Sequence, residues 1–144
     1  YAPLYISDYC SNHCTYCGFN CNTQTRRLKL SIEQIEAEAR VIAGMGIRHI
    51  LILTGEAPSI TPISYLESVV TLLKRYFSSI GIEIFPMDED DYQTLKTAGV
   101  DALTVYQEVY DPAIYKTVHL KGRKTDYAYR LLTPERGARA GFSR

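Results

Sequence analysis

The sequence predicts an α/β domain in which βα units build a parallel sheet. Segments typical of strands alternate four times with segments typical of helices. Alternation with short connections is the pattern of parallel sheets with right-handed crossovers. Two architectures fit this order. The units could form an open doubly wound sheet by themselves, or they could form about the first half of a (β/α)8 barrel, which needs about 250 residues.

The predicted strands are short apolar runs bounded by polar residues or glycine. They cover Leu4–Ser7, His49–Leu53, Ile82–Phe85 and Ala102–Tyr106. The run at His49–Leu53 has no polar interruption after its first residue, which is typical of a strand covered on both faces. Gly141 and Phe142 are predicted to lead into another strand.

Helices are predicted between these strands from apolar residues at helical spacing. They begin near Ser31, Thr61, Asp88 and Lys124. Ser31 and Gln34 have the spacing of a capping box, and Gly44 ends that helix. Thr61 and Pro62 place a cap residue before a proline in the first turn. In the last helix, which runs to Ala140, Pro134 is predicted to kink or restart the chain.

The composition is that of an ordinary globular protein. The 144 residues have a formal net charge of +0 and 46% are hydrophobic, so no nucleic-acid partner and no membrane contact are predicted. The first residues lack the basic-then-apolar order of a secretory signal, which favours a cytoplasmic location. Because chemistry-bearing residues follow almost directly after Tyr1, residues 1–144 are interpreted as a partial core domain of a longer chain.

A loop rich in cysteine follows the first predicted strand. Cys10, Cys14 and Cys17 have C-x3-C-x2-C spacing, close enough for one loop to surround one cluster. In a reducing compartment such cysteines are more often metal ligands than disulfides. Three thiolates on four irons leave one iron open to an outside ligand. The spacing therefore predicts a [4Fe–4S] cluster with an open iron.

Three other interpretations of this loop stay open at this stage. His13 with the three cysteines has the composition of a Cys3His zinc site, although adjacent ligands at positions 13 and 14 are geometrically awkward. Cys21 as a fourth ligand would give an electron-transfer cluster. The cysteines could also be reduced thiols without a metal.

The motif C-x3-C-aromatic-x-C after the first strand, with Tyr16 at the aromatic position, resembles the radical SAM superfamily. The resemblance implies that S-adenosylmethionine (SAM) binds the open iron through its amino and carboxylate groups. Reductive cleavage of SAM then releases a 5′-deoxyadenosyl radical. It also implies that Tyr16 lies near the adenine.

The same resemblance implies a set of SAM-binding residues beyond the cysteine loop. Thr54-Gly55-Glu56 is similar to the superfamily's Gly-Gly-Glu motif, where Gly55 and Glu56 would receive the ammonium group. Glu108 would accept hydrogen bonds from the ribose hydroxyls. Arg130 would bind the carboxylate, because its fork of donors suits a bidentate partner. His119–Lys124 is a basic run with no predicted role, since such runs are most often solvated.

Within the superfamily the chain is most similar to the aromatic-amino-acid lyases, and among these to the 2-iminoacetate synthase family of thiamine biosynthesis. The motifs that carry this resemblance are Leu4–Ser7, Cys17–Phe19, Leu53–Glu56, Val105–Glu108, His119–Gly122 and Tyr129–Leu131. The implied reaction splits the Cα–Cβ bond of L-tyrosine to p-cresol and dehydroglycine. The implied partners are L-tyrosine, an external electron donor of flavodoxin or ferredoxin type, and thiazole synthase.

The tyrosine lyase that matures [FeFe]-hydrogenase shares most of these motifs and is the alternative within the branch. Where the family has Gln-Glu-Thr-Tyr-His, this sequence has Val109 and Asp111 at the third and fifth positions. Substrate-side roles are therefore not transferred to this turn. The resemblance leaves the residues of the tyrosine pocket unassigned, and a half-barrel is expected to be inactive alone.

Overall fold

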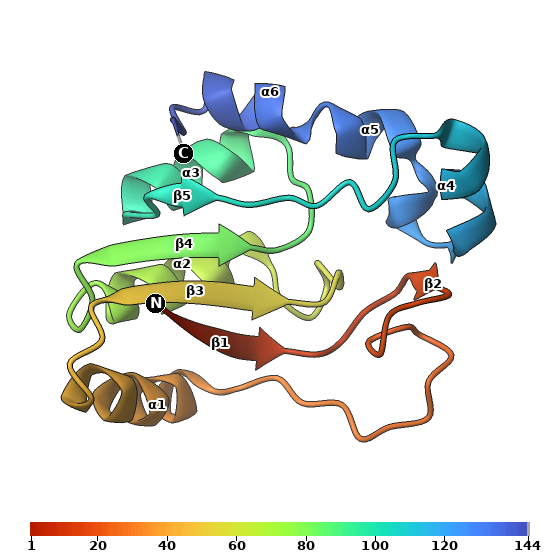
Figure 1. Ribbon diagram of the computed structural model, residues 1–144. Helices are drawn as coiled ribbons and strands as arrows, with labels where there is room; N and C mark the ends of the chain where they lie inside the picture. Colours follow the sequence, from red (N-terminus) through yellow and green to blue (C-terminus); the bar gives the residue numbers. More distant parts are fainter. Residues whose placement is uncertain (144) are drawn as a thin grey trace.

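The computed structural model describes residues 1–143 and contains a four-stranded parallel sheet with helices packed against it (Figure 1). The strands are β1 (Ala2–Ser7), β3 (His49–Thr54), β4 (Ser79–Glu83) and β5 (Ala102–Leu103), in the order β1-β3-β4-β5. This order runs in one direction, so right-handed crossovers place their helices on one face. The winding is therefore that of the first half of a (β/α)8 barrel, since a doubly wound sheet reverses its order.

Three crossover helices connect the strands, namely α1 (Ile32–Gly44), α2 (Ile63–Leu73) and α3 (Glu89–Ala98). The capping box predicted for α1 is confirmed: the Ser31 side chain accepts from the Gln34 backbone and the Gln34 side chain accepts from the Ser31 backbone. The cap predicted for α2 is wrong. Pro62 occupies the N-cap position, and the Thr61 hydroxyl instead donates to the Ala57 carbonyl at 3.3 Å.

Only one face of the sheet is fully buried by the helices. Alternate strand residues pack into the core, and these are Leu4, Ile6, Ile50, Ile52, Ile80 and Ile82. The residues between them point to the other face, where Tyr5 is 54% exposed and Leu51 and Leu53 are half-buried. The prediction that His49–Leu53 is covered on both faces is therefore wrong for the described residues. The uncovered face is the one that would line the inside of a barrel.

The chain after β5 is more divided than predicted. It forms α4 (Pro112–Val118), β6 (His119–Lys121), a 3₁₀ turn (Arg123–Thr125), α5 (Tyr127–Leu131) and α6 (Thr133–Arg139). The predicted single helix from Lys124 thus begins later and breaks at Leu132, and Pro134 restarts it in the first turn of α6. Helix α4 was not predicted. Neither was the antiparallel pair of β6 with β2 (His13–Cys14).

Two strand boundaries also differ from the prediction. Strand β4 begins at Ser79 because Ser79 pairs with His49 of β3, and it ends at Glu83 instead of Phe85. Strand β5 has two residues, which pair with Gly81 and Ile82. The strand predicted after Gly141 reaches the limit of the described residues and stays a prediction.

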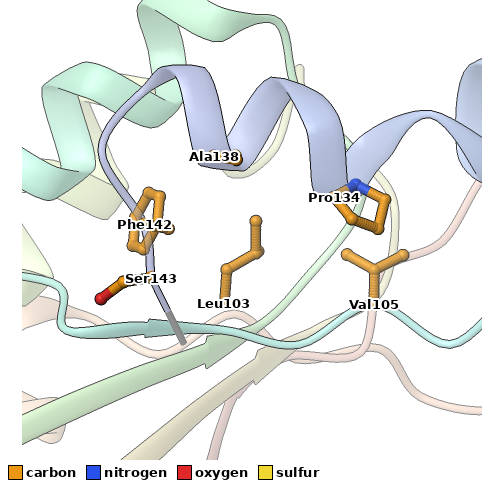
Figure 2. Close-up of a pocket in the computed structure, with 7 residues that line it drawn as sticks. Leu103, Val105, Pro134, Ala138, Phe142 and Ser143 are labelled. Atoms are coloured by element: carbon orange, nitrogen blue, oxygen red, sulfur yellow. The ribbon is translucent and has the colours of Figure 1, made fainter.

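Helix α6 packs directly over β5 and the residues that follow it. Figure 2 shows Leu103 and Val105 pointing toward Pro134 and Ala138 of α6, with Phe142 on the segment that follows the helix. These residues line an apolar cavity of ≈ 210 Å³. Gly137 permits this approach, because a Cβ there would lie 2.6 Å from the Leu103 Cδ2. The cavity is lined by carbon atoms and one serine, so it belongs to the packing of the fold. No helix within residues 1–143 is long and apolar enough to cross a membrane.

The capping box gives a stability prediction. Ser31→Ala removes the acceptor for the Gln34 amide at the start of α1, and we expect the free energy of unfolding to fall by about 1 kcal/mol. Urea denaturation of the full-length protein measures it. Ser68→Ala is the control, because its hydroxyl bonds the carbonyl one turn back within exposed α2 surface. Equal stability losses in both variants would contradict a special role for the cap.

Candidate functional site

A cavity of ≈ 240 Å³ lies at the carboxyl edge of the sheet, where the arrowheads of β1, β3 and β4 point toward β2 and α4 (Figure 1). Parallel α/β folds place ligands at this edge. The cavity lining includes seven of the eight residues predicted for the site: Cys10, Cys14, Cys17, Gly55, Glu56, Glu108 and Arg130. Residues far apart in sequence are thus brought to one cavity.

The cysteine loop is fixed to the rest of the chain by its backbone. Cys14 lies in β2, which pairs with β6, and the Thr15 amide donates to the Val118 carbonyl at 3.0 Å. The Cys21 amide donates to the Asn12 carbonyl at 2.8 Å, which closes the loop on itself. The loop conformation therefore does not depend on its thiols alone.

The three predicted ligands are free thiols that share the cavity. Burial raises the pKa of the Cys14 thiol, and the positive charge of Lys124 opposes that rise. Among residues 1–143, no three His, Cys, Asp or Glu side chains lie close enough to hold one metal ion. In a cubane each thiolate binds a different iron, so its ligands stand further apart than those of a single ion. Three thiols that share one cavity are the donor type that holds iron–sulfur clusters.

His13 and Cys21 do not line the cavity. The His13 Nδ1 lies 3.0 Å from the Asn22 side-chain nitrogen, and the Cys21 thiol lies 3.6 Å from the Asn22 side-chain oxygen. The Cys3His zinc arrangement is thus not assembled in the described residues. A four-cysteine cluster would require Cys21 to move into the cavity.

Gly55 is required by the close packing of β3 against the cysteine loop. A Cβ at this position would lie 2.3 Å from the Tyr9 carbonyl oxygen and 3.0 Å from the Cys10 Cβ. The Gly55 amide also donates to the Ser7 carbonyl at 3.0 Å. The absence of a side chain lets the strand end contact the backbone that carries the first thiol.

Glu56 is a buried carboxylate whose main partner sequence reasoning missed. Its Oε2 accepts from the Asn12 side chain at 2.6 Å, and its Oε1 lies 4.0 Å from the Arg123 Nε. Its backbone carbonyl accepts hydrogen bonds from both the amide and the hydroxyl of Ser11, each at 2.9 Å. Asn12 lies between the first two cysteines, but nothing in its local sequence indicates a partner 44 residues away.

Glu108 and Arg130 come from the segments that follow β5. Glu108 has a φ of 71°, an unusual conformation for a residue with a side chain. Its carboxylate pairs with the Lys124 ammonium at 2.9 Å. Arg130 is buried and its Nε donates to the Tyr106 carbonyl at 2.8 Å. Because β5 ends at Leu103, strand alternation does not govern where Gln107 and Glu108 point.

Two further polar side chains are candidates for the site, the carboxamide of Gln107 and the carboxyl group of Glu83. The Gln107 side-chain nitrogen is buried and has no hydrogen-bond partner within the described residues, but Gln107 is absent from the cavity lining. Glu83, at the end of β4, does line the cavity. Burial, with the nearby Glu108 charge, raises the pKa of the Glu83 carboxyl.

Tyr16 is the one predicted site residue outside the cavity lining. Its hydroxyl lies 2.6 Å from His119 Nε2, and its ring meets the His119 ring edge-on. The His119 Nδ1 must carry the ring proton because it lies 2.8 Å from the Tyr115 carbonyl, which only accepts. Tyr16 is therefore the donor to Nε2. Burial lowers the pKa of His119, which keeps the imidazole neutral.

Comparison with known proteins identifies the family. Residues 4–144 match the sequence profile described as the Radical SAM superfamily. The chain belongs to this superfamily. A [4Fe–4S] cluster and SAM are therefore its cofactors, and the cavity carries the thiols and the polar side chains that such cofactors need.

Two curated relatives are 2-iminoacetate synthases, from Salmonella typhimurium and Escherichia coli. Each is 41% identical over 144 residues, which is 100% of this chain and 38% of the relative. The 3-methylornithine synthase of Methanosarcina barkeri is 28% identical over 81% of the chain and 34% of its own length. The chain thus spans well under half of the relatives it matches.

Solved structures give the same fold. The [FeFe]-hydrogenase maturase HydG from Carboxydothermus hydrogenoformans superimposes with a TM-score of 0.93 at 37% identity, over 98% of this chain and 34% of HydG. Methylornithine synthase (PylB) superimposes with a TM-score of 0.86 over 99% of the chain and 42% of its own. At 23% identity that second likeness concerns the fold alone.

The packing of Gly55 gives a prediction for cluster assembly. In Gly55→Ala the added Cβ would collide with the Tyr9 carbonyl and the Cys10 side chain and push both away from the end of β3, so we expect a large loss of iron and sulfide per chain after anaerobic reconstitution. Gly18→Ala is the matched control, because Gly18 follows Cys17 directly and a Cβ there meets nothing within 4 Å. Full iron content in Gly55→Ala would show that the loop tolerates the displacement.

Proposed function

We propose that this chain supplies the cofactor-binding half of a radical SAM lyase that splits the Cα–Cβ bond of L-tyrosine into p-cresol and 2-iminoacetate. The observation that carries the proposal is the 41% identity to two 2-iminoacetate synthases along all 144 residues. The cofactors supply a carbon radical when bound. The chain supplies the thiols that hold the cluster and the polar groups that orient SAM.

Cys10, Cys14 and Cys17 are the proposed cluster ligands. Their thiols share one cavity, whereas Cys21 and His13 contact Asn22 outside it. Three thiolates leave one iron open, which is the coordination that SAM binding requires. The backbone pairing of β2 with β6 supports this role, because it fixes Cys14 before any metal binds.

The polar groups of the cavity are the proposed SAM ligands. Gly55 and Glu56 offer oxygen acceptors to the ammonium group, and Arg130 offers guanidinium donors to the carboxylate. Glu108 Oε1 is paired with Lys124, which leaves Oε2 to accept from the ribose. Tyr16 stays a proposed adenine neighbour on the strength of the motif, since its ring lies beside Lys124 rather than in the cavity lining.

The substrate side of the site is proposed to come largely from outside these residues. We propose that residues 1–144 are a partial core domain, inactive alone, because the uncovered sheet face leaves the cavity open to water on that side. A carbon radical attacks almost any nearby C–H bond, so water exclusion and tight positioning are required. The proposed partners are a flavodoxin or ferredoxin as electron donor and thiazole synthase. Four free thiols favour the cytoplasm as the compartment.

A second function within the same branch is supported by structure. The superposition on HydG, with a TM-score of 0.93, favours a role in maturing [FeFe]-hydrogenase through a tyrosine lyase. The two functions share the cofactor half and differ in the fate of the fragments of tyrosine after its cleavage. The products formed from tyrosine therefore distinguish the two functions.

The ligand assignment predicts a sharp contrast among the four cysteines. Cys10→Ala, Cys14→Ala and Cys17→Ala should each abolish the [4Fe–4S] cluster after anaerobic reconstitution, and Cys21→Ala should retain it. Iron counting and electron paramagnetic resonance (EPR) of the reduced protein measure this. Cluster loss in Cys21→Ala comparable to the other three would replace the open-iron mechanism with an electron-transfer cluster.

The substrate assignment is tested with the full-length protein, a reductant, SAM and isotopically labelled L-tyrosine. We expect labelled p-cresol and 5′-deoxyadenosine without carbon monoxide or cyanide. Cresol accompanied by both diatomics would assign the hydrogenase-maturation role instead. Deoxyadenosine without cresol would reject tyrosine as the substrate while retaining the radical SAM chemistry.

A further inference from the structure

Lys124 is a largely shielded lysine that the family motifs do not include. It is the last residue of the basic run His119–Lys124, which begins in β6 and for which the sequence predicts no role. In the structure its side chain is only 12% exposed and it lines the same cavity as the three thiols. Burying an ammonium group is costly unless it is paired, so its position requires an explanation.

The backbone of Lys124 is fixed directly to the cysteine loop. Its amide donates to the Asn12 Oδ1 at 3.0 Å, and its carbonyl accepts the Tyr115 hydroxyl at 2.6 Å. Gly122 makes this approach possible, because it has a φ of +91° and a Cβ there would lie 2.2 Å from the Asn12 Oδ1. The Lys124 backbone is therefore fixed relative to the cysteine loop.

The ammonium group lies among electron-rich groups. The Lys124 Nζ is 2.9 Å from the Glu108 Oε1 and 5.4 Å from the centre of the Tyr16 ring. Glu108 itself adopts a positive φ, which is strained for a residue with a side chain and persists only where surrounding contacts impose it. The ion pair is such a contact.

We propose that Lys124 is a positioning residue with two linked effects: its ammonium holds the Glu108 carboxylate at the SAM side of the cavity, and its charge raises the reduction potential of the cluster. The inference rests on the proposed cluster ligation by Cys10, Cys14 and Cys17. A fixed cation stabilises the reduced cluster because reduction adds negative charge. The same cation orients the carboxylate that accepts from the ribose.

A structural lysine predicts a different outcome from a positioning lysine. If the side chain only filled space and supported the loop, Lys124→Gln would lower cluster occupancy without changing the properties of the clusters that form. If its charge acts on the site, the clusters that form are harder to reduce and SAM binds less tightly. The potential and the affinity thus report on the charge, and the iron content reports on the loop.

The experiment uses the full-length protein reconstituted anaerobically. For Lys124→Gln we expect a more negative cluster potential, measured by EPR-monitored redox titration, and a SAM dissociation constant raised about tenfold. Lys124→Arg should restore most of the potential because it restores the charge. Lys121→Gln is the control: Lys121 is exposed at the end of β6, three residues before Lys124, and its charge is screened by solvent.

A wild-type potential and a wild-type SAM affinity in Lys124→Gln overturn the inference. If Lys124→Gln assembles no cluster, the variant Glu108→Gln tests the inference in its place. Removing this carboxylate leaves the cation in place, so the potential should stay or rise while SAM affinity falls, and a lowered potential would refute the assignment. Failure of the wild-type protein to assemble a cluster would instead refute the proposed cluster ligation itself.

Discussion

The close contact between the end of β3 and the cysteine loop is the constraint on which the site depends. At Gly55 the strand backbone touches the Tyr9 carbonyl and the Cys10 side chain, with no room for a Cβ. One residue later, Glu56 accepts from Asn12 at 2.6 Å. These two contacts attach the loop at the points that flank its first thiol. The parallel sheet places the end of β3 beside the loop, and the absence of a side chain at Gly55 allows the two backbones to come into contact.

Asn12 extends this constraint to a third segment of the chain. Its side chain donates to Glu56 after β3 and accepts from the Lys124 amide after β6. Its backbone carbonyl accepts from Cys21. One amide side chain thus joins the cysteine loop, the second βα unit and the segment after β5. A carboxylate or an apolar residue at this position could not donate and accept in this way.

The sequence predicted the elements whose pattern is local. The apolar strands, the Ser31 capping box and the C-x3-C-x2-C spacing each depend on neighbouring residues, and the βα order follows from them. The pairing of β2 with β6 depends on residues about a hundred positions apart, so no local pattern marks it. The same holds for Asn12 and Lys124. Within the His119–Lys124 run, Lys121 and Arg123 are exposed as predicted, whereas His119 is buried and the Lys124 amide bonds Asn12.

The two faces of the sheet differ in the side chains that they present. The contacts of Cys14, Glu56 and Lys124 are made through backbone pairing and through side chains at the carboxyl edge of the sheet. The other face of the sheet presents Tyr5, at 54% exposure, and the half-buried Glu83. Because strands in a barrel alternate between the helix side and the interior, these side chains point to the interior. The face that the helices leave uncovered thus contributes Tyr5 and Glu83 to the same cavity as the three thiols.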